Sequence, residues 1–244
     1  MSQDGFLDFS MGEGDENVGK RSKRFSAETG RTYRVSFVAF SKYDDATGLP
    51  TEDALIKYAG CDRIYLKGVG NILVNAENAA AMAEFGTAKQ SVATVICVWP
   101  TDKDGELDAT SYTAGKGFTV QPWVFAAEKY AVIKLSNKKF PLRKTDLSLA
   151  CSDGTYQKMT FSPENESLLL KYLGSDKPQY VAIAKKIIAE ARALIPSLNG
   201  ELATKMTPQQ IREKLGGATP NAGGNEGGGG HAAKDVDDLL KNLV

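Results

Sequence analysis

Histidine and cysteine are scarce in this sequence, and the residues present are not clustered. The single histidine, His231, lies in a glycine-rich stretch where nothing orients it as a base or a metal ligand. The sequence contains no Cys-x-x-Cys pair, phosphate-binding glycine loop or dinucleotide fingerprint. Gly68-Val69-Gly70 is too short for such a glycine motif and is expected to form only a bend. We therefore expect no metal, no cofactor and no enzymatic activity, with carboxylate-only catalysis as the remaining enzymatic alternative.

Long apolar runs are also missing. No stretch approaches the roughly 18 apolar residues that a membrane span needs, and the first residues do not form an apolar run behind a basic start. Cys61, Cys97 and Cys151 are odd in number and far apart, which is typical of reduced interior thiols rather than of a disulfide framework. We expect a soluble intracellular protein.

The chain also has no net charge, but its charged residues are unevenly distributed. The 30 Lys and Arg residues balance the 30 Asp and Glu residues. Residues 1–16 contain acidic side chains and no basic ones, whereas residues 17–34 contain six basic side chains against Glu28 alone. The basic cluster Lys20, Arg21, Lys23 and Arg24 could bind either phosphates or an acidic patch on a neighbouring molecule.

The composition divides the chain into five parts. Residues 1–24 are too polar to fold and are expected to form a flexible arm. Residues 25–173 form the expected core, and residues 174–215 a helical extension packed on it. Residues 216–234 hold eight glycines and act as a linker. Residues 235–244 form an acidic amphipathic tip that needs a surface to dock on.

The core pattern predicts mainly β structure with peripheral α-helices. Strands are expected over 31–40, 61–69, 91–99, 118–125 and as a pair within 145–161, and 91–125 is expected to form a long hairpin. Helices are expected after Pro50, over 76–85 with Asn75 as the N-cap, over 126–137, over 180–195 and from Pro208. Short strands with frequent turns favour a barrel or a sandwich over alternating βαβ units.

Basic residues alternate with aromatic residues on these strands and their loops. Single-stranded DNA presents phosphates, which attract Lys and Arg, and unstacked bases, which stack on aromatic rings. Taken singly, each aromatic fits core packing better, above all Tyr33, Phe37, Phe125 and Phe161. The candidate DNA contacts are Lys42, Tyr43, Tyr58, Arg63, Tyr65, Lys67, Lys89, Trp99, Tyr112, Lys116, Phe118, Trp123, Lys129, Arg143, Lys144, Tyr156 and Lys158.

Several segments together resemble the helix-destabilising, single-stranded DNA-binding proteins of tailed bacteriophages. The segments that carry the resemblance are the basic cluster Lys20 to Ser26, the strand Gly30 to Phe37, the hairpin Ser91 to Phe125, the strands Asp146 to Phe161 and the tip Asp235 to Leu240. The resemblance implies an OB-type five-stranded barrel core and cooperative contact between neighbouring copies through the basic arm. It also implies that the tip recruits replication and recombination proteins of the helicase-loader, polymerase or recombinase class. The tip residues are Asp235, Val236, Asp237, Asp238, Leu239, Leu240 and Leu243.

The sequence departs from that family in one respect. Well-known members carry a zinc-binding segment with clustered His and Cys, and no such cluster occurs here. The resemblance implies cooperative, sequence-independent coating of single strands during phage DNA replication, recombination and repair, in the cytoplasm of the infected host cell. Two alternatives stay open: a phage structural or assembly protein without affinity for single strands, and a strand-annealing factor.

Overall fold

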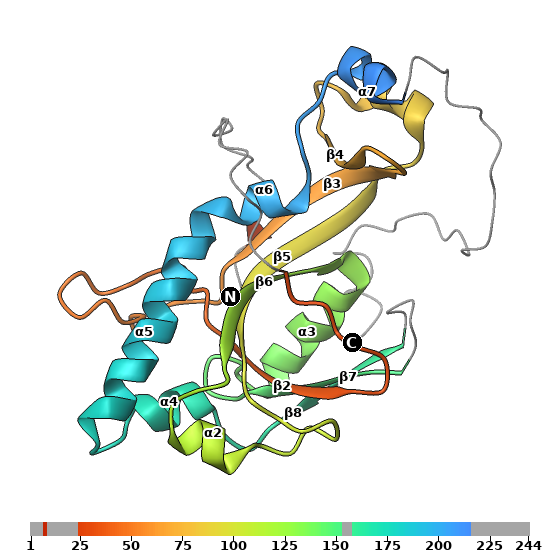
Figure 1. Cartoon of the computed structure of the whole chain (residues 1–244). Coiled ribbons are helices and arrows are strands. Elements are labelled where there is room, and N and C mark those ends of the chain that lie inside the picture. The colour runs from red at the N-terminus through yellow and green to blue at the C-terminus, as the bar shows by residue number, and fades with distance from the viewer. Residues whose placement is uncertain (1–6, 9–23, 153–157, 216–244) are drawn as a thin grey trace.

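The computed structural model describes residues 7–8, 24–152 and 158–215, and its framework is a mainly antiparallel sheet (Figure 1). The strands are β1 (Leu7–Asp8), β2 (Thr32–Phe37), β3 (Tyr58–Leu66), β4 (Gly70–Val74), β5 (Lys89–Val98), β6 (Thr119–Ala126), β7 (Leu147–Cys151) and β8 (Met159–Pro163). The helices are α1 (Ala79–Met82), α2 (Ala109–Thr113), α3 (Ala127–Lys139), α4 (Leu168–Leu173), α5 (Pro178–Leu194), α6 (Leu198–Leu202) and α7 (Pro208–Lys214). Two 3-10 turns, η1 (Ala83–Phe85) and η2 (Ile195–Ser197), complete the order.

Strand β5 lies at the centre of the sheet. One edge of β5 pairs with β6 from Ser91 opposite Ala126 to Val98 opposite Thr119. The other edge is shared, because its first half pairs with β3 and its second half with β2. The nearly continuous apolar sequence of β5 fits this position, since both of its faces are buried. The expected central hairpin is confirmed.

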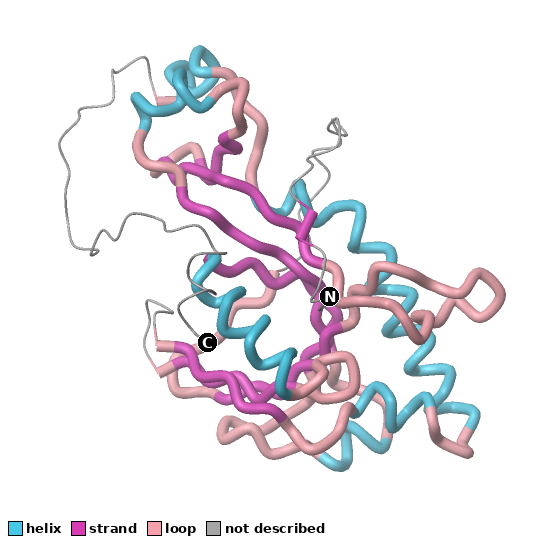
Figure 2. The backbone as a smooth tube through the Cα atoms, turned by 180° about the vertical axis from the view of Figure 1, so that it is seen from behind, coloured by secondary structure: helices cyan, strands magenta, loops and turns pink. Residues whose placement is uncertain are grey.

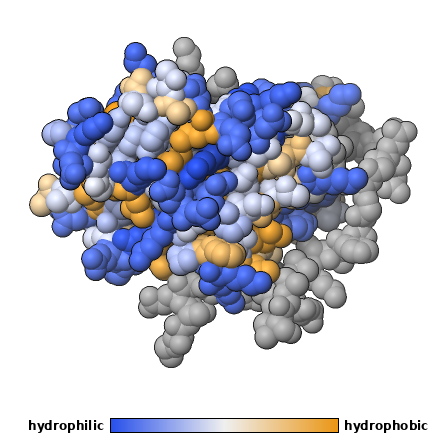
Figure 3. Space-filling view, turned by 90° about the horizontal axis from the view of Figure 1, so that it is seen from below, coloured by the Kyte–Doolittle hydropathy of each residue, from blue (hydrophilic) through white to orange (hydrophobic). Residues whose placement is uncertain are grey.

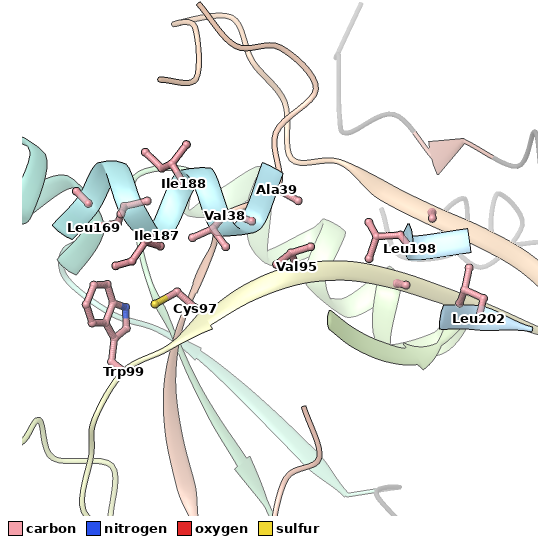
Figure 4. Close-up of a cluster of buried hydrophobic side chains, with 14 of the residues drawn as sticks. Val38, Ala39, Val95, Cys97, Trp99, Leu169, Ile187, Ile188, Leu198 and Leu202 are labelled. Atoms are coloured by element: carbon pink, nitrogen blue, oxygen red, sulfur yellow. The ribbon is translucent and has the colours of Figure 1, made fainter. Parts of the chain in front are cut away.

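Each face of the sheet carries its own helices. The face that includes Val95 and Cys97 packs against Ile187 and Ile188 of α5 and against Leu198 of α6 (Figure 4). The opposite face packs around α3, which lies inside the curve of the sheet when the molecule is seen from behind (Figure 2). The expected helical extension is therefore bound to the core by buried apolar contacts.

The described strands do not close into a barrel. The order is β1-β3-β5-β2-β7-β8, with β4 beside β3 and β6 beside β5. The edges of β6 and β8 approach each other through the rings of Trp123 and Phe161, whose centroids are 6.1 Å apart. The segment that precedes β2 spans this side, because Phe25 N–H donates to the Pro122 carbonyl and Gly30 N–H to the Cys151 carbonyl, each at 2.8 Å.

A second, smaller cluster forms where the hairpin of β3 and β4 projects from the rest of the molecule (Figure 1). Ile64 and Ile72 of the hairpin contact Met82 and Phe85, and Ile211 of α7 covers them. The chain between α6 and α7 runs along the edge of β4, where Thr204 N–H donates to the Asn71 carbonyl at 2.9 Å. The last described part of the chain thus stabilises the projecting hairpin.

Two expected helices differ from the structure. The described residues between Pro50 and β3 form a loop instead of the expected short helix. This loop pairs with residues 40–43: Ser41 N–H donates to the Leu55 carbonyl at 2.8 Å, and Ile56 forms a β-bridge with Phe40. The helix expected over 76–85 is limited to α1 and η1, and Asn78 rather than Asn75 precedes it. Asn75 and Asn78 exchange side-chain hydrogen bonds in a turn, which competes with an earlier helix start.

Within the described part of the chain, no helix combines the length and the apolar character that crossing a membrane would require. The lower face of the molecule is largely hydrophilic, with hydrophobic residues in small patches (Figure 3).

Candidate nucleic-acid interface

The end of the projecting hairpin carries an exposed aromatic ring among basic residues. Tyr65 is 70% exposed, the highest value among the exposed large hydrophobic residues. Arg63 lies two residues earlier on β3 and so points to the same face, and Lys89 of β5 lies directly opposite Arg63. Lys67 follows in the turn and is exposed. We call Arg63, Tyr65, Lys67 and Lys89 the tip cluster.

Local structure explains why the tip cluster is open. Gly68 and Gly70, with φ of 85° and 105°, make the tight turn that returns the chain into β4. Helix α6 covers the same face only as far as Arg63, whose Nη1 donates to the Leu202 carbonyl at 3.3 Å. Partial burial lowers the pKa of Arg63, but a guanidinium remains charged at neutral pH. The cluster therefore presents fixed positive charge beside a free ring.

Comparison with known proteins yields no relative. No protein-family model matches the chain. Neither a curated protein nor a solved structure matches it. The function of this chain is therefore inferred from its residues and their geometry.

A second basic surface lies at the end of α3. Lys138, Lys139 and Lys144 are exposed there around Phe140, which is 45% exposed. Arg143 is partly buried, and its Nη1 donates to the carbonyls of Glu52 and Ala54. Arg143 and Lys144 were among the expected DNA contacts, whereas Lys138, Lys139 and Phe140 were not. The run Lys-Lys-Phe-Pro-Leu-Arg-Lys was a visible signal, since its only aromatic follows directly on two lysines.

Three of the expected DNA contacts lie in the interior. Tyr58, Trp99 and Trp123 are 4%, 2% and 3% exposed. The Trp99 Nε1 donates to Ser36 Oγ at 2.7 Å, and that hydroxyl donates to the buried carboxylate of Asp146. A buried ring offers no face on which a base can stack, so these three residues do not belong to the proposed interface. Tyr33, Phe37 and Phe125 are buried as expected, and Phe161 is partly buried.

Other expected contacts are half-buried in ring clusters. Tyr43 packs beneath the Arg192 guanidinium, 5.1 Å from its ring centroid. Tyr112 stacks on Tyr172 with centroids 4.6 Å apart, and burial raises the pKa of Tyr172 to about 12. Phe118 packs against Trp99 at 6.2 Å. Tyr112 and Phe118 thus hold the connection between β5 and β6 in the core, and Tyr43 holds the loop after β2 against α5, which are structural roles.

The remaining expected cations are dispersed. Lys42 pairs with Asp53 at 2.5 Å in the loop before β3, and Lys116 is exposed after α2. Lys129 is partly buried on α3, and Lys158 is exposed at the start of β8. Several expected residues lie outside the described part of the chain: Lys20, Arg21, Lys23, Tyr156 and the C-terminal residues 235–244. Arg24 is described and is partly buried.

The described residues contain no group of three or more His, Cys, Asp or Glu side chains placed to hold a metal ion. Electrostatic contact with an anionic partner is the chemistry that the tip cluster supports.

Proposed function

We propose that this protein binds single-stranded DNA without sequence preference. The observation that carries the proposal is the tip cluster, where a ring with 70% exposure stands on the same face as two basic side chains. Rings of this kind stack on any base, and the cations contact the phosphates. Zero net charge agrees with a basic surface of limited extent rather than a uniformly basic molecule.

An OB-type core is part of the proposal, and the strand pairings support it. Strand β2 pairs with β5 and β7, β5 with β6, and β7 with β8, while α3 follows β6 in the chain. In an OB barrel, five strands are joined in this way, and nucleic acid contacts the second and third strands and the loop between the first and second. The equivalents here are β5, β6 and residues 38–88.

The position of the helices favours the hairpin as the contact surface. The face of β5 and β6 that an OB-type protein would use is covered by α5 and α6. Arg63, Tyr65 and Lys67 of the tip cluster, by contrast, belong to the connection between β2 and β5, and the cluster extends beyond α6. We therefore place the single strand on the projecting hairpin.

The ends of the chain complete the proposal. The arm that contains Lys20, Arg21, Lys23 and Arg24 would link neighbouring copies on DNA. The acidic C-terminal segment 235–244 would shield the basic surface until DNA displaces it. It would also recruit replication and recombination proteins during phage DNA metabolism. Both roles follow from the resemblance to the phage single-stranded DNA-binding proteins.

Fluorescence anisotropy of labelled oligo-dT, with duplex competitor and across a salt titration, tests the function. We expect binding that weakens as salt rises and resists duplex competition. Replacing Tyr65 with Ala should weaken binding by about 1–3 kcal/mol because one stacked base is lost. Replacing Lys89 with Ala should reduce the salt slope by about 1.

Tyr65→Phe is the matched control, since it keeps the ring and should bind nearly as well as the wild type. Absence of binding at low salt, with both the full chain and a form lacking residues 235–244, would rule out the function. Self-association without affinity for DNA would then favour the structural protein.

A further inference from the structure

A cavity of about 850 Å³ lies at the far end of β5 from the tip cluster. One wall is the segment from Arg24 to Arg31, and the other is formed by the residues that follow β5 and begin β6, including Pro100, Thr101 and Gln121. The volume falls within the range of roughly 300–1,000 Å³ that small-molecule sites occupy. Lys89 and Val98 end the same ten-residue strand, so the two sites are separate.

The first wall is held in place by the core. The ring of Phe25 packs edge-on against Tyr33 and Trp123 at 5.1 and 6.0 Å. Gly30 is fixed to Cys151 by a backbone hydrogen bond, and Glu28 N–H donates to the Tyr33 hydroxyl at 3.0 Å. The cavity is therefore a preformed feature rather than a gap beside a loose segment.

The polar groups that line the cavity favour an anion. Arg31 lies over the Tyr33 ring at 5.0 Å, its Nη2 donates to the Thr101 carbonyl at 3.4 Å, and its Nη1 is 3.5 Å from Glu28. Its Nε is buried and has no hydrogen-bond acceptor among the described residues. A buried donor without an acceptor is costly, which points to an acceptor supplied by a ligand.

Thr101, Thr119 and Gln121 add neutral hydroxyl and amide groups to the cavity, and Arg24 is also one of its lining residues. Glu28 is the only carboxylate among the lining residues. Asp102 stands next to the wall in sequence, but it does not line the cavity, and its Oδ1 accepts backbone N–H groups of Asp104 and Glu106.

We propose that this cavity binds one nucleoside phosphate, with the phosphate on Arg31 and the base against Pro100. Guanidinium groups suit phosphate because their N–H donors match its oxygens in pairs. The same chemistry is offered by a free nucleotide and by one nucleotide of a DNA strand. The second source rests on the proposed function; the first does not.

The experiment is calorimetric titration of the full chain with dTMP, with inorganic phosphate and with oligo-dT of about 16 nucleotides, the upper limit for one OB-type module. Two variants test the cavity: Gln121→Glu, nearly isosteric, which places a carboxylate in it, and Arg31→Ala. Each should weaken dTMP binding about tenfold or more. Inorganic phosphate should bind more weakly than dTMP, because it has no base to contact Pro100.

Gln179→Glu, on the exposed first turn of α5, is the charge-matched control and should bind dTMP like the wild type. Arg212→Ala is matched to Arg31→Ala, because Arg212 also pairs with a Glu and lies over a ring, 6.0 Å from Phe85. Thermal unfolding of all four variants excludes loss of folding as the cause.

The two sources give different results. Weaker binding of both dTMP and oligo-dT by Gln121→Glu supports a nucleotide of the strand, and weaker binding of dTMP alone supports a free nucleotide. Oligo-dT binding by a wild type that does not bind dTMP, unchanged in Gln121→Glu and Arg31→Ala, overturns the cavity site and leaves the proposed function intact. If the wild type does not bind oligo-dT, the proposed function fails. The cavity site is then tested by dTMP binding alone, in the wild type and in the two cavity variants.

Discussion

The three cysteines behave as interior residues of the sheet. Cys61, Cys97 and Cys151 are 4%, 0% and 1% exposed, on β3, β5 and β7. Burial raises the pKa of the Cys61 thiol to about 11 and that of Cys97 well above its usual value. The sequence predicted their interior position from their number and spacing, and the structure confirms it.

Alkylation should therefore be slow in the folded protein at pH 9 and fast for all three thiols in denaturant, because the thiolate is the reactive form. The raised pKa of Cys61 also links stability to pH. Above pH 9 the unfolded thiol loses its proton, whereas the folded thiol keeps it until about pH 11, so this contribution to stability falls as pH rises through that range. Cys61→Ala should lack that component in urea unfolding curves, and rapid alkylation of the native protein would contradict the burial.

Two tyrosines on β3 show what residue type alone does not decide. Tyr58 is 4% exposed and Tyr65 is 70% exposed. Seven positions separate them, so they point to opposite faces of the strand. Tyr58 packs against Tyr130 of α3 at 5.0 Å, whereas Tyr65 lies beyond the helices that cover the other face. Both were expected DNA contacts, and only the placement of the helices separates them.

At the scale of elements, α7 followed its sequence signals closely. Thr207 precedes Pro208, and Gln210 stands three residues after Thr207. The structure contains the expected capping box, in which the Thr207 hydroxyl accepts from Gln210 N–H and the Gln210 side chain accepts from Thr207 N–H. Local hydrogen bonds of this kind depend only on neighbours in the chain, which is why sequence predicts them.

Thr207→Ala should destabilise the protein by about 1 kcal/mol through loss of this cap. Because Ile211 of α7 is fully buried over the hairpin, hydrogen exchange in β4 should also become faster. Gln209→Ala, on the exposed side of the same helix, is the control and should change stability much less. Equal effects of the two substitutions in urea unfolding and hydrogen exchange would show that the cap does not hold α7.

Helix α2 carries a comparable signal in its sequence, although no helix was expected there. Asp108 accepts hydrogen bonds from Thr110 N–H and Ser111 N–H at 3.0 and 3.1 Å and so begins the helix. The loop after Pro50 shows the opposite case, because pairing with residues 40–43 of the same loop replaced the expected helix. Caps are readable from sequence, whereas pairing between two loop segments is not.

At the scale of the whole molecule, charge is balanced between separate parts of the chain. Residues 235–244 contain three Asp and one Lys, so removing them leaves a net positive protein. In the proposed function, single-strand binding should stay equal or become tighter in this truncated form, most clearly at low salt, while recruitment of partners is lost. Oligo-dT anisotropy compares the two forms, with Lys241→Ala in the full chain as a control that leaves the Asp residues in place. Weaker binding by the truncated form would refute the shielding role.

The sequence by itself determined the β-rich core that begins at Phe25, the central hairpin, the helical extension and the capped α7. Each of these depends on apolar periodicity or on neighbouring residues, and both are written locally in the chain. The tertiary structure decided which aromatic rings are free. Trp99 is buried because its ring packs against that of Tyr172 of α4, with centroids 5.6 Å apart. Tyr65 is exposed because α6 covers this face only as far as Arg63. Burial is set by contacts between distant segments, so residue type and spacing predicted basic and aromatic candidates, but only the folded chain shows which of them are exposed.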